Sequence, residues 1–277
     1  MVNNYKSKMG EINVELMKLS WATVIVESKG TSVLIDPLGA PIKGQDRPLT
    51  ARLGEPLEPL VSLETINKPN AILITHFHED HFDVQSVLAC FGEDVPIYIP
   101  KEGVEYASKY GFKNVTGVGP NDAFLINDMK VTASYSVDGF GFPQVSWVLS
   151  DGDHTIVHCG DTLWHGYWWG MEQQYGPIHA VCLPVNGAVL DIYGLKTQSS
   201  LPACLTPEEA VEAAKILNAK YLVPIHYRTF DNPPYYCETE NVEDRLIETG
   251  KVQGVTIKFL KSKERLNLKK GPKKVQS

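Results

Sequence analysis

The sequence predicts an α/β (α+β) protein in which two β-sheets pack face to face and helices cover their outer sides, a four-layer αββα sandwich. Two observations lead to this fold class. Short β-branched runs between Gly, Pro, Asn and Asp predict strands, and a strand series followed by helices occurs twice along the chain. No linker separates the halves, so we expect one domain over residues 1–260 and a basic tail over residues 261–277.

The first strand series opens the chain, and its runs are rich in Val, Ile, Leu and Thr. These predicted strands cover residues 12–19, 23–27, 31–35 and 71–75. Residues 37–60 interrupt the series with five prolines and three glycines, a composition that predicts a loop. Loops of this length in a compact domain are usually lids or binding loops.

The pattern then changes to alternating helices and strands. Helices are predicted over residues 84–90 and 104–110, and strands over residues 97–99, 131–134, 145–149 and 155–158. In the second half, Thr206 to Glu209 has the pattern of a capping box with proline at the first helical position. After that helix we expect a strand over residues 221–225, a helix over 242–248 and a final strand over 255–260.

The composition excludes several classes of protein. Apolar residues make up 43% and charged residues 21% of the 277 residues, which argues against a disordered or fibrous chain. No apolar run approaches the roughly 20 residues of a membrane-spanning helix, and the N-terminal residues lack the apolar core of a signal peptide. The five cysteines are odd in number and form no C-x-x-C pair, so we expect reduced thiols and a cytoplasmic protein.

The net charge of −7 is unevenly distributed. Residues 261–277 carry seven basic side chains and one acidic one, so the acidic excess lies in the body of the chain. Because nucleic-acid binding depends on clustered Lys and Arg, the acidic body argues against a broad nucleic-acid surface. We expect the tail to be a solvated terminus; its contact with RNA, an anionic surface or a neighbouring subunit is the alternative.

The most informative segment follows the predicted strand 71–75, where His76, His78, Asp80 and His81 lie close together. Three of the eight histidines fall within six residues. In extended backbone, residues 76 and 78 point the same way and can bind one cation, while Asp80 and His81 turn toward a second. Imidazole and carboxylate ligands suit zinc, manganese or iron, and two such ions can hold a bridging hydroxide.

Two later predicted strands end in residues of the same ligand types. Asp161 follows the strand 155–158, and His226 follows the strand 221–225. Either residue alone is more simply explained as a turn former or a core histidine. Three strand ends that all carry ligand types predict one shared metal site.

These residues resemble the metallo-β-lactamase superfamily of hydrolases. The resemblance rests on the H-x-H-x-D-H run at 76–81, the turn Gly160-Asp161-Thr162 and the segment Pro224-Ile225-His226-Tyr227. It covers most of the chain and is nearest in pattern to the branch that includes the L-ascorbate-6-phosphate lactonase. It implies a four-layer αββα sandwich with the metals at the edge that its two sheets share.

The resemblance also implies a ligand set. His76 and His78 would bind the first metal, Asp80, His81 and His226 the second, and Asp161 would bridge the two. Where the family has a further histidine this chain has none, and the alignment places Asp138 there, with Ser136 as the fallback. A carboxylate at this position would favour manganese or iron over zinc. The alternative is that Asp138 is a turn residue and that only one metal is held.

Other residues near these strand ends are candidates for supporting roles. His158 is expected to orient Asp161 or another ligand. Trp164 and His165 belong to an aromatic cluster after Asp161 that would either pack in the core or line a substrate pocket. Arg228 would meet an anionic group of the substrate, with Arg47 and Arg52 as weaker candidates, although surface salt bridges explain these arginines equally well.

The predicted function is hydrolysis of a small molecule, because a metal-held hydroxide needs no protein nucleophile and Asp80 would help to manage the proton. The resemblance favours a lactone or related ester as substrate, and a phosphodiester is the alternative. A different class of function is a binding or sensing protein with a degraded metal site. An exposed sheet edge or the aromatic cluster would also allow a homo-oligomer.

Overall fold

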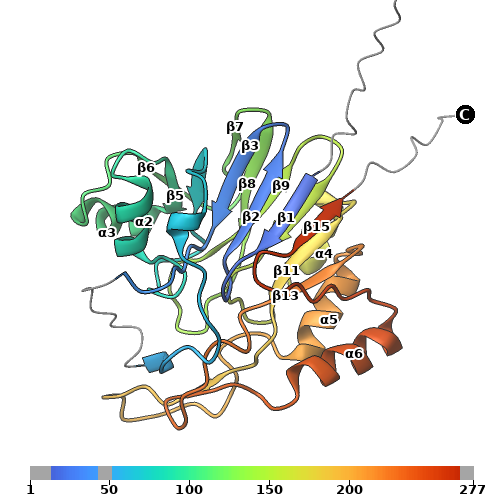
Figure 1. The fold of residues 1–277 in the computed structure, drawn as a ribbon. Coiled ribbons are helices and arrows are strands. Elements are labelled where there is room, and N and C mark those ends of the chain that lie inside the picture. The colour runs from blue at the N-terminus through green and yellow to red at the C-terminus, as the bar shows by residue number, and fades with distance from the viewer. Residues whose placement is uncertain (1–13, 43–51, 269–277) are drawn as a thin grey trace, which may run out of the picture.

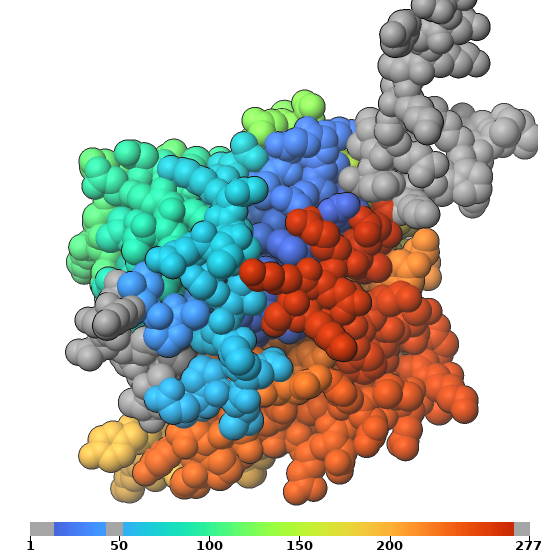
Figure 2. All heavy atoms as spheres, in the orientation of Figure 1, coloured from blue at the N-terminus to red at the C-terminus, as the bar shows by residue number. Residues whose placement is uncertain are grey.

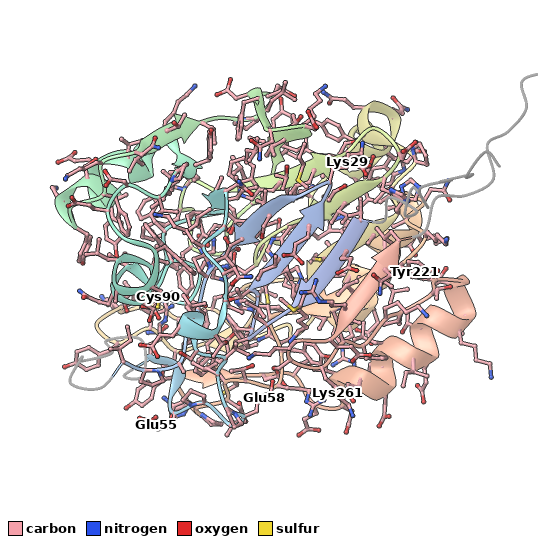
Figure 3. All side chains as sticks on the ribbon, turned by 45° about the horizontal axis from the view of Figure 1, so that its top comes forward. Lys29, Glu55, Glu58, Cys90, Tyr221 and Lys261 are labelled. Atoms are coloured by element: carbon pink, nitrogen blue, oxygen red, sulfur yellow. The ribbon has the colours of Figure 1, made fainter. Side chains whose placement is uncertain are left out.

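The structure, a computed structural model, describes residues 14–42 and 52–268. Two β-sheets lie face to face in the middle of the molecule, and helices lie on the outer side of each sheet (Figure 1). Side chains fill the space between the sheets (Figure 3), and the largest of them include the fully buried Trp21 and Trp147. The predicted four-layer fold class is confirmed.

The first sheet has seven strands in the order β15-β1-β2-β3-β4-β5-β6. The strands β15, β1, β2 and β3 pair antiparallel, whereas β3 to β6 pair parallel. The strands are β1 (Val14–Lys18), β2 (Val24–Ser28), β3 (Thr31–Ile35), β4 (Ala71–Leu73), β5 (Ile97–Pro100), β6 (Val115–Val118) and β15 (Arg265–Leu268). The parallel half needs crossovers: helix α2 (Val84–Phe91) lies in the one from β4 to β5, and helix α3 (Val104–Lys109) lies in the one from β5 to β6.

The second sheet has six strands in the order β13-β11-β10-β9-β8-β7. They are β7 (Ala123–Ile126), β8 (Met129–Tyr135), β9 (Val145–Ser150), β10 (Thr155–His158), β11 (Ala180–Pro184) and β13 (Leu222–Ile225). The helices α4 (Trp168–Tyr175), α5 (Pro207–Ile216) and α6 (Val242–Gln253) belong to this half. A small separate sheet pairs β12 (Val189–Leu190) with β14 (Tyr236–Cys237).

Three apolar clusters hold the four layers together. The central cluster lies between the sheets and draws residues from both, and the other two join each sheet to its helices. Burying one large apolar side chain contributes about 1.5–3 kcal/mol. Helix α5 begins with the predicted capping box, in which the Thr206 side chain and the Glu209 side chain each bind the other residue's backbone N–H. None of the helices among the described residues is long and apolar enough to cross a bilayer.

The C-terminal predictions are wrong in two respects. Residues 255–260 form no strand, and only Ile257 makes an isolated bridge to Leu222. The last strand is instead β15, which pairs with β1, so the predicted domain boundary after residue 260 cuts through the sheet. The basic composition concealed this strand, whose Arg265 guanidinium binds the carboxylates of Glu15 on β1 and Glu27 on β2. In Figure 2 this C-terminal segment, in red, lies against the N-terminal strands, in blue.

Residues 37–42 and 54–60 form neither helix nor strand, as the loop prediction requires, but residues 52 and 53 are helical. Residues 43–51, with Arg47, lie outside the described residues. Two short 3-10 turns, η1 (Leu63–Thr65) and η2 (Lys101–Gly103), were not predicted, nor was helix α4. Three strands end next to residues of the predicted metal site. The chain leaves β4, β10 and β13 and enters the segments that carry His76, Asp161 and His226.

Candidate metal centre

Four side chains form a first group of possible metal ligands beyond the end of β4. They are His76, His78, Asp138 and Asp161, and one ligand atom from each lies within 4.8 Å of the others. His76 Nε2 is 2.8 Å from His78 Nδ1 and 3.5 Å from Asp161 Oδ2. His78 Nδ1 is 3.8 Å from Asp138 Oδ1. Two imidazoles and two carboxylates therefore converge on one point.

A second group lies beside the first. It contains Asp80, His81 and His226, whose ligand atoms also lie within 4.8 Å of one another. Asp80 Oδ2 is 3.6 Å from both His81 Nε2 and His226 Nε2. Asp161 joins the groups, because its Oδ2 is 3.9 Å from His81 Nε2 as well as 3.5 Å from His76 Nε2.

Gly160 permits the turn that brings Asp161 to this place. Its φ of +63° lies in the left-handed region that favours glycine. A Cβ atom at this position would lie 2.8 Å from Thr75 Oγ1. The glycine therefore lets the turn after β10 pack directly against the residue that precedes His76.

A buried carboxylate that the sequence did not single out, Asp36, orients both groups. Its Oδ2 accepts hydrogen bonds from His81 Nδ1 (2.8 Å) and Thr75 Oγ1 (2.6 Å), and its Oδ1 accepts from the Thr75 backbone N–H. Because the Thr75 hydroxyl proton is used on Asp36, its oxygen accepts the Nδ1–H of His76 at 3.1 Å. Both histidines therefore direct Nε2 toward the ligand groups, and loss of the Nε2 proton of His81 would give it the lone pair that a metal needs.

Trp21 supports the second group. Its Nε1–H donates to Asp80 Oδ2 at 3.1 Å, and its ring lies 3.9 Å from that of His226, centroid to centroid. Sequence reasoning missed both Asp36 and Trp21. Asp36 directly follows the predicted strand 31–35, the same signal that identified Asp161, whereas nothing in the local sequence distinguishes Trp21.

Unpartnered buried atoms test whether the residues fit a bound metal. Four ligand atoms are buried and have no hydrogen-bond partner: His81 Nε2, Asp138 Oδ1, Asp161 Oδ1 and His226 Nε2. Buried polar atoms in proteins nearly always have a hydrogen-bond partner, so four unpartnered atoms in these two adjacent groups need an explanation. Divalent cations at the two groups would satisfy His81 Nε2, Asp138 Oδ1 and His226 Nε2, and the mixed imidazole and carboxylate donors suit transition metals.

Asp138, the residue in place of the family's histidine, lies in the first group. Its Oδ2 accepts the backbone N–H bonds of Phe140 and Phe142, which fixes the carboxylate and leaves Oδ1 toward His78. Ser136, the alternative residue for this position, is not one of the grouped ligand candidates. Its hydroxyl donates instead to the Cys159 carbonyl.

His158 is fully buried, and both of its ring nitrogens are used. Nε2–H donates to the Ala22 carbonyl at 2.8 Å, and Nδ1 accepts the Gly160 N–H at 3.2 Å. It therefore has no lone pair left for a metal, and its contact with Gly160 holds the turn that precedes Asp161.

Burial controls the protonation of two ligand candidates. It lowers the pKa of His226 to about 4, and it holds the pKa of His76 well below the usual value with help from the neighbouring His81 and His78. Both imidazoles are neutral at pH 7 and keep the lone pair that a metal needs.

His81 and Asp161 behave differently. Burial lowers the pKa of His81, but the carboxylates of Asp36 and Asp80 outweigh it and raise that pKa to about 9. Burial raises the pKa of Asp161 to about 8, and the nearby carboxylates of Asp138 and Asp80 reinforce the shift. Without metal, each of these two groups therefore holds a proton at pH 7.

We expect metal binding at pH 7 to release about two protons, one from His81 and one from Asp161. Apparent affinity should rise with pH and level off above about 9, because both pKa values lie above 7. Calorimetric titration of Mn²⁺ into metal-free protein, in two buffers of different ionisation enthalpy, measures the release. A His179→Gln control should match wild type, and an affinity independent of pH between 6 and 9 would contradict the expectation.

The three predicted substrate contacts lie away from the ligand groups. The Arg228 guanidinium donates to Glu243 Oε1 at 2.8 Å on the surface. His165 stacks on Trp168 with 3.8 Å between ring centroids, and Trp164 packs beside the same ring. None of the three lines the cavity over the ligand groups.

That cavity is small, with a volume of about 20 Å³. Its lining combines ligand candidates with apolar walls and one cationic side chain, Arg52, whose Nη2 donates to Asp80 Oδ1 at 3.2 Å. The lining residues are Arg52, His78, Asp80, Phe140, Asp161, Ala188, Leu190, Ala203, Cys204, His226 and Tyr236. Arg52, the weaker sequence candidate, thus occupies the place predicted for Arg228.

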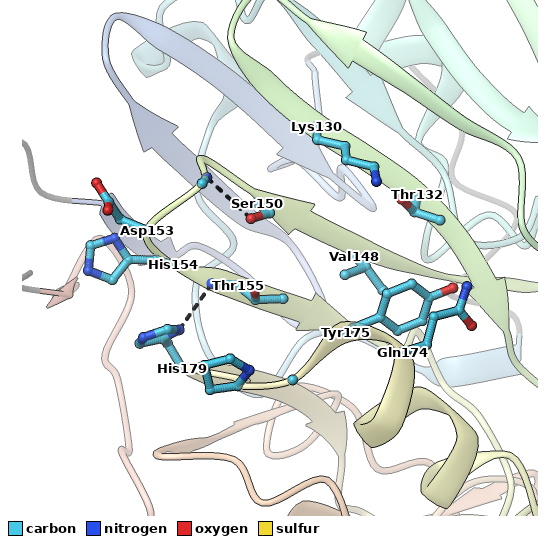
Figure 4. A pocket seen from close by; sticks show the side chains of 13 residues that line it. Lys130, Thr132, Val148, Ser150, Asp153, His154, Thr155, Gln174, Tyr175 and His179 are labelled. Atoms are coloured by element: carbon cyan, nitrogen blue, oxygen red, sulfur yellow. Dashed lines mark hydrogen bonds between the residues drawn. The ribbon is translucent and has the colours of Figure 1, made fainter. Parts of the chain in front are cut away.

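A larger cavity of about 380 Å³ lies at the other end of the six-stranded sheet (Figure 4). It lies where β10 and β11 begin, between residues such as Thr155, His179 and Tyr175, whereas the ligand groups lie beyond the ends of these strands. None of the ligand candidates lines it. The larger of these two cavities is therefore not the one that contains the candidate metal ligands.

Comparison with known proteins agrees with this fold and site. The profile described as Beta-lactamase superfamily domain matches residues 31–227. This segment extends from β3 through the end of β13 and contains every ligand candidate. The fold and the site thus define a protein of the metallo-β-lactamase superfamily.

A UPF0173 metal-dependent hydrolase from Caldivirga maquilingensis is 31% identical over 217 residues, which cover 76% of this chain and 81% of the relative. The chain therefore belongs to the UPF0173 metal-dependent hydrolase family of this superfamily. Solved structures share the fold. An isothiocyanate hydrolase from Delia radicum gut bacteria has a TM-score of 0.72 at 21% identity and covers 93% of this chain and 100% of its own. The metallo hydrolase Igni18 from Ignicoccus hospitalis has a TM-score of 0.68 at 17% identity, with coverage of 93% and 99%.

Proposed function

We propose that this metal-dependent hydrolase opens a lactone or related carboxylic ester, with one divalent cation held by each of the two ligand groups. The observation that supports the proposal best is the pair of adjacent groups joined by Asp161, with unpartnered buried ligand atoms in both. His76, His78 and Asp138 would hold one cation, Asp80, His81 and His226 the other, and Asp161 both. Bound cations of this kind lower the pKa of water toward 7 and polarise a carbonyl oxygen.

Asp80 is the residue that we propose to accept the proton of the attacking water and to return it to the leaving alkoxide. It lines the cavity, and the Trp21 indole fixes its Oδ2. Burial raises the pKa of Asp80, but the charged His81, the contact with the His226 imidazole and the charged Arg52 together hold it well below the usual value.

Water is the favoured nucleophile because no protein nucleophile is ready at the cavity. Cys204 lines it, but its Sγ donates to Asn186 Oδ1 at 2.7 Å, and burial raises the pKa of the thiol far above 7. A thiol that stays protonated is a poor nucleophile. Covalent catalysis would need a group that the described lining does not offer.

The substrate class rests on chemical resemblance. The lactonase-like motifs of the sequence favour a carbonyl carbon as the reacting centre, and an isothiocyanate also reacts at carbon. A substrate panel should therefore contain lactones, aryl esters, isothiocyanates and bis-aryl phosphodiesters. We expect turnover of lactones or esters, and turnover of the phosphodiesters alone would overturn the preference for carbon.

Metal content tests the proposed centre directly. Elemental analysis of protein purified without added metal should find about two ions per chain, manganese or iron ahead of zinc because Asp138 replaces a histidine. Asp138→Ala should retain one ion and the double variant Asp80→Ala, His81→Ala should lose the ion of the second group. Two ions in Asp138→Ala would remove Asp138 from the ligand set, and none in wild type would overturn the dinuclear centre.

A further inference from the structure

Arg52 has a position that no other basic side chain shares among residues 14–42 and 52–268. Among the residues that line the cavity over the ligand groups it is the only Lys or Arg. Its side chain is 40% exposed, whereas those of Asp80 and Asp161 are 5% and 13% exposed. The guanidinium thus lies at the rim of the cavity, and the ligand candidates form its floor.

The main chain around Arg52 is fixed. The Arg52 carbonyl accepts a hydrogen bond from Asn232 Nδ2 at 3.1 Å. Two residues later, Gly54 has a φ of +80° and packs so closely that a Cβ atom there would lie 2.9 Å from the Asn232 Cβ. Contacts with the segment after β13 therefore hold the rim arginine beside the cavity.

The other walls offer almost no polar recognition. Phe140, Leu190 and Ala203 are apolar, and Gly139 packs against the Ala203 backbone, where a Cβ atom would lie 2.2 Å from its carbonyl oxygen. The Tyr236 hydroxyl already accepts a hydrogen bond from Asn186. Apart from the ligand candidates, the Arg52 guanidinium is the one charged group among the described residues that line this cavity.

We propose that Arg52 binds an anionic group of the substrate, so that the substrate class is a small lactone or ester that carries a carboxylate or similar anion away from the reacting carbonyl. This inference rests on the proposed function. Because the cavity is small, most of a substrate whose carbonyl reaches the ligand groups would lie at the rim, beside Arg52 and Phe140. One nitrogen of the guanidinium contacts Asp80, and the guanidinium as a whole has five N–H donors, enough to bind a carboxylate as well.

A simpler role for Arg52 is to balance the charge of Asp80 through their ion pair. In that case its removal would weaken metal binding or turnover equally for charged and neutral substrates. If Arg52 recognises an anion, its removal instead changes the ratio of kcat/KM between the charged and the neutral substrate. A pair of matched substrates therefore separates these roles.

The test uses full-length, metal-loaded protein as wild type, Arg52→Ala and Arg52→Lys, with Arg228→Ala as the matched arginine control. The substrates are γ-butyrolactone and the same ring with a carboxylate at C5, compared by kcat/KM, and metal content is measured for every variant. Calorimetry with succinate and butyrate measures anion binding without turnover. We expect Arg52→Ala to lose about 10- to 100-fold in kcat/KM for the charged lactone relative to the neutral one, and to lose the preference for succinate.

Arg52→Lys should recover part of this preference because it keeps the charge but not the planar fork. Arg228→Ala should keep the wild-type ratio, since its guanidinium binds Glu243 on the surface. An equal loss for both lactones in Arg52→Ala would overturn the inference and leave the proposed function intact. Succinate binding that depends on Arg52, without turnover of either lactone, would instead support the anion site and count against the proposed function.

Discussion

Asp161→Asn is expected to abolish the retention of both metals and to reduce hydrolysis by more than about 100-fold. Loss of a residue that merely orients a ligand costs about 10- to 100-fold, and Asp161 is the carboxylate that both ligand groups share. An amide of the same size keeps one acceptor but loses the charge. Elemental analysis and kcat/KM with a substrate that the wild type turns over measure the two effects.

The same substitution should not destabilise the metal-free fold. Burial and nearby carboxylates raise the pKa of Asp161 to about 8, so the folded protein favours the neutral carboxyl and loses stability as the pH rises from about 4 to 8. Asparagine mimics that neutral form. At pH 7 the metal-free variant should melt no lower than wild type, and added Mn²⁺ should raise the melting temperature of wild type alone.

A matched control is Asp128→Asn, which changes an exposed carboxylate between β7 and β8. It should keep wild-type metal content and activity. If Asp161→Asn retained two metals, the assignment of Asp161 as the shared ligand would fail. If it lost metal and also unfolded at a lower temperature without metal, the carboxylate would have a structural role that its raised pKa does not predict.

The strand-end residues were predictable because several ligand types recur at one structural position. Three histidines in six residues exceed what a core or a surface usually contains, and Asp161 and His226 follow apolar strands. Asp36 follows the strand 31–35 in the same way, so the same rule, applied to every strand, would have found it. Asp36 stands between this strand and the predicted loop 37–60, and a lone Asp after a strand is more often a turn former.

Arg228 and Arg52 show why spacing alone misplaced the basic residue. Side chains at positions i and i+2 point to the same side only where the backbone is extended. His226 and Arg228 have φ values of +58° and +68°, so the chain turns after β13 and the Arg228 side chain lies beside Glu243 instead of the cavity. Arg52 reaches the cavity from a segment far away in sequence, and only the fold brings these segments together.

The strand β15 was missed for a different physical reason. Its alternation places Leu266 and Leu268 toward the core, but it is only four residues long and lies within a basic segment. The charge of Arg265 is matched by Glu15 and Glu27 on neighbouring strands, which sequence reasoning cannot pair in advance. The basic composition therefore led to the prediction that this segment lies outside the domain, although ion pairs with other strands hold it in the sheet.

The second large effect is expected from Asp36→Asn. Asparagine tolerates the left-handed backbone of Asp36, whose φ is +47°, so the main chain should keep its path. The amide cannot accept from the Thr75 N–H, the Thr75 hydroxyl and His81 Nδ1 together. An amide N–H facing His81 Nδ1 would favour the tautomer with its proton on Nε2, the atom that faces Asp80 and Asp161.

We therefore expect Asp36→Asn to weaken metal binding by about 10- to 100-fold and to lower the free energy of unfolding by about 2 kcal/mol. Asp151→Asn is the matched control, because this buried carboxylate accepts bonds from Ser28 and from the backbone N–H groups of Asp153 and His154, far from the ligand groups. It should lower stability and leave metal affinity unchanged. Nitrogen-15 NMR of the histidine rings, recorded without metal above the His81 pKa of about 9 so that the wild-type ring is neutral, measures the tautomer. Wild-type metal affinity in a destabilised Asp36→Asn would limit Asp36 to a structural role, whereas a changed tautomer with lost affinity would establish that it sets the lone pairs of the metal centre.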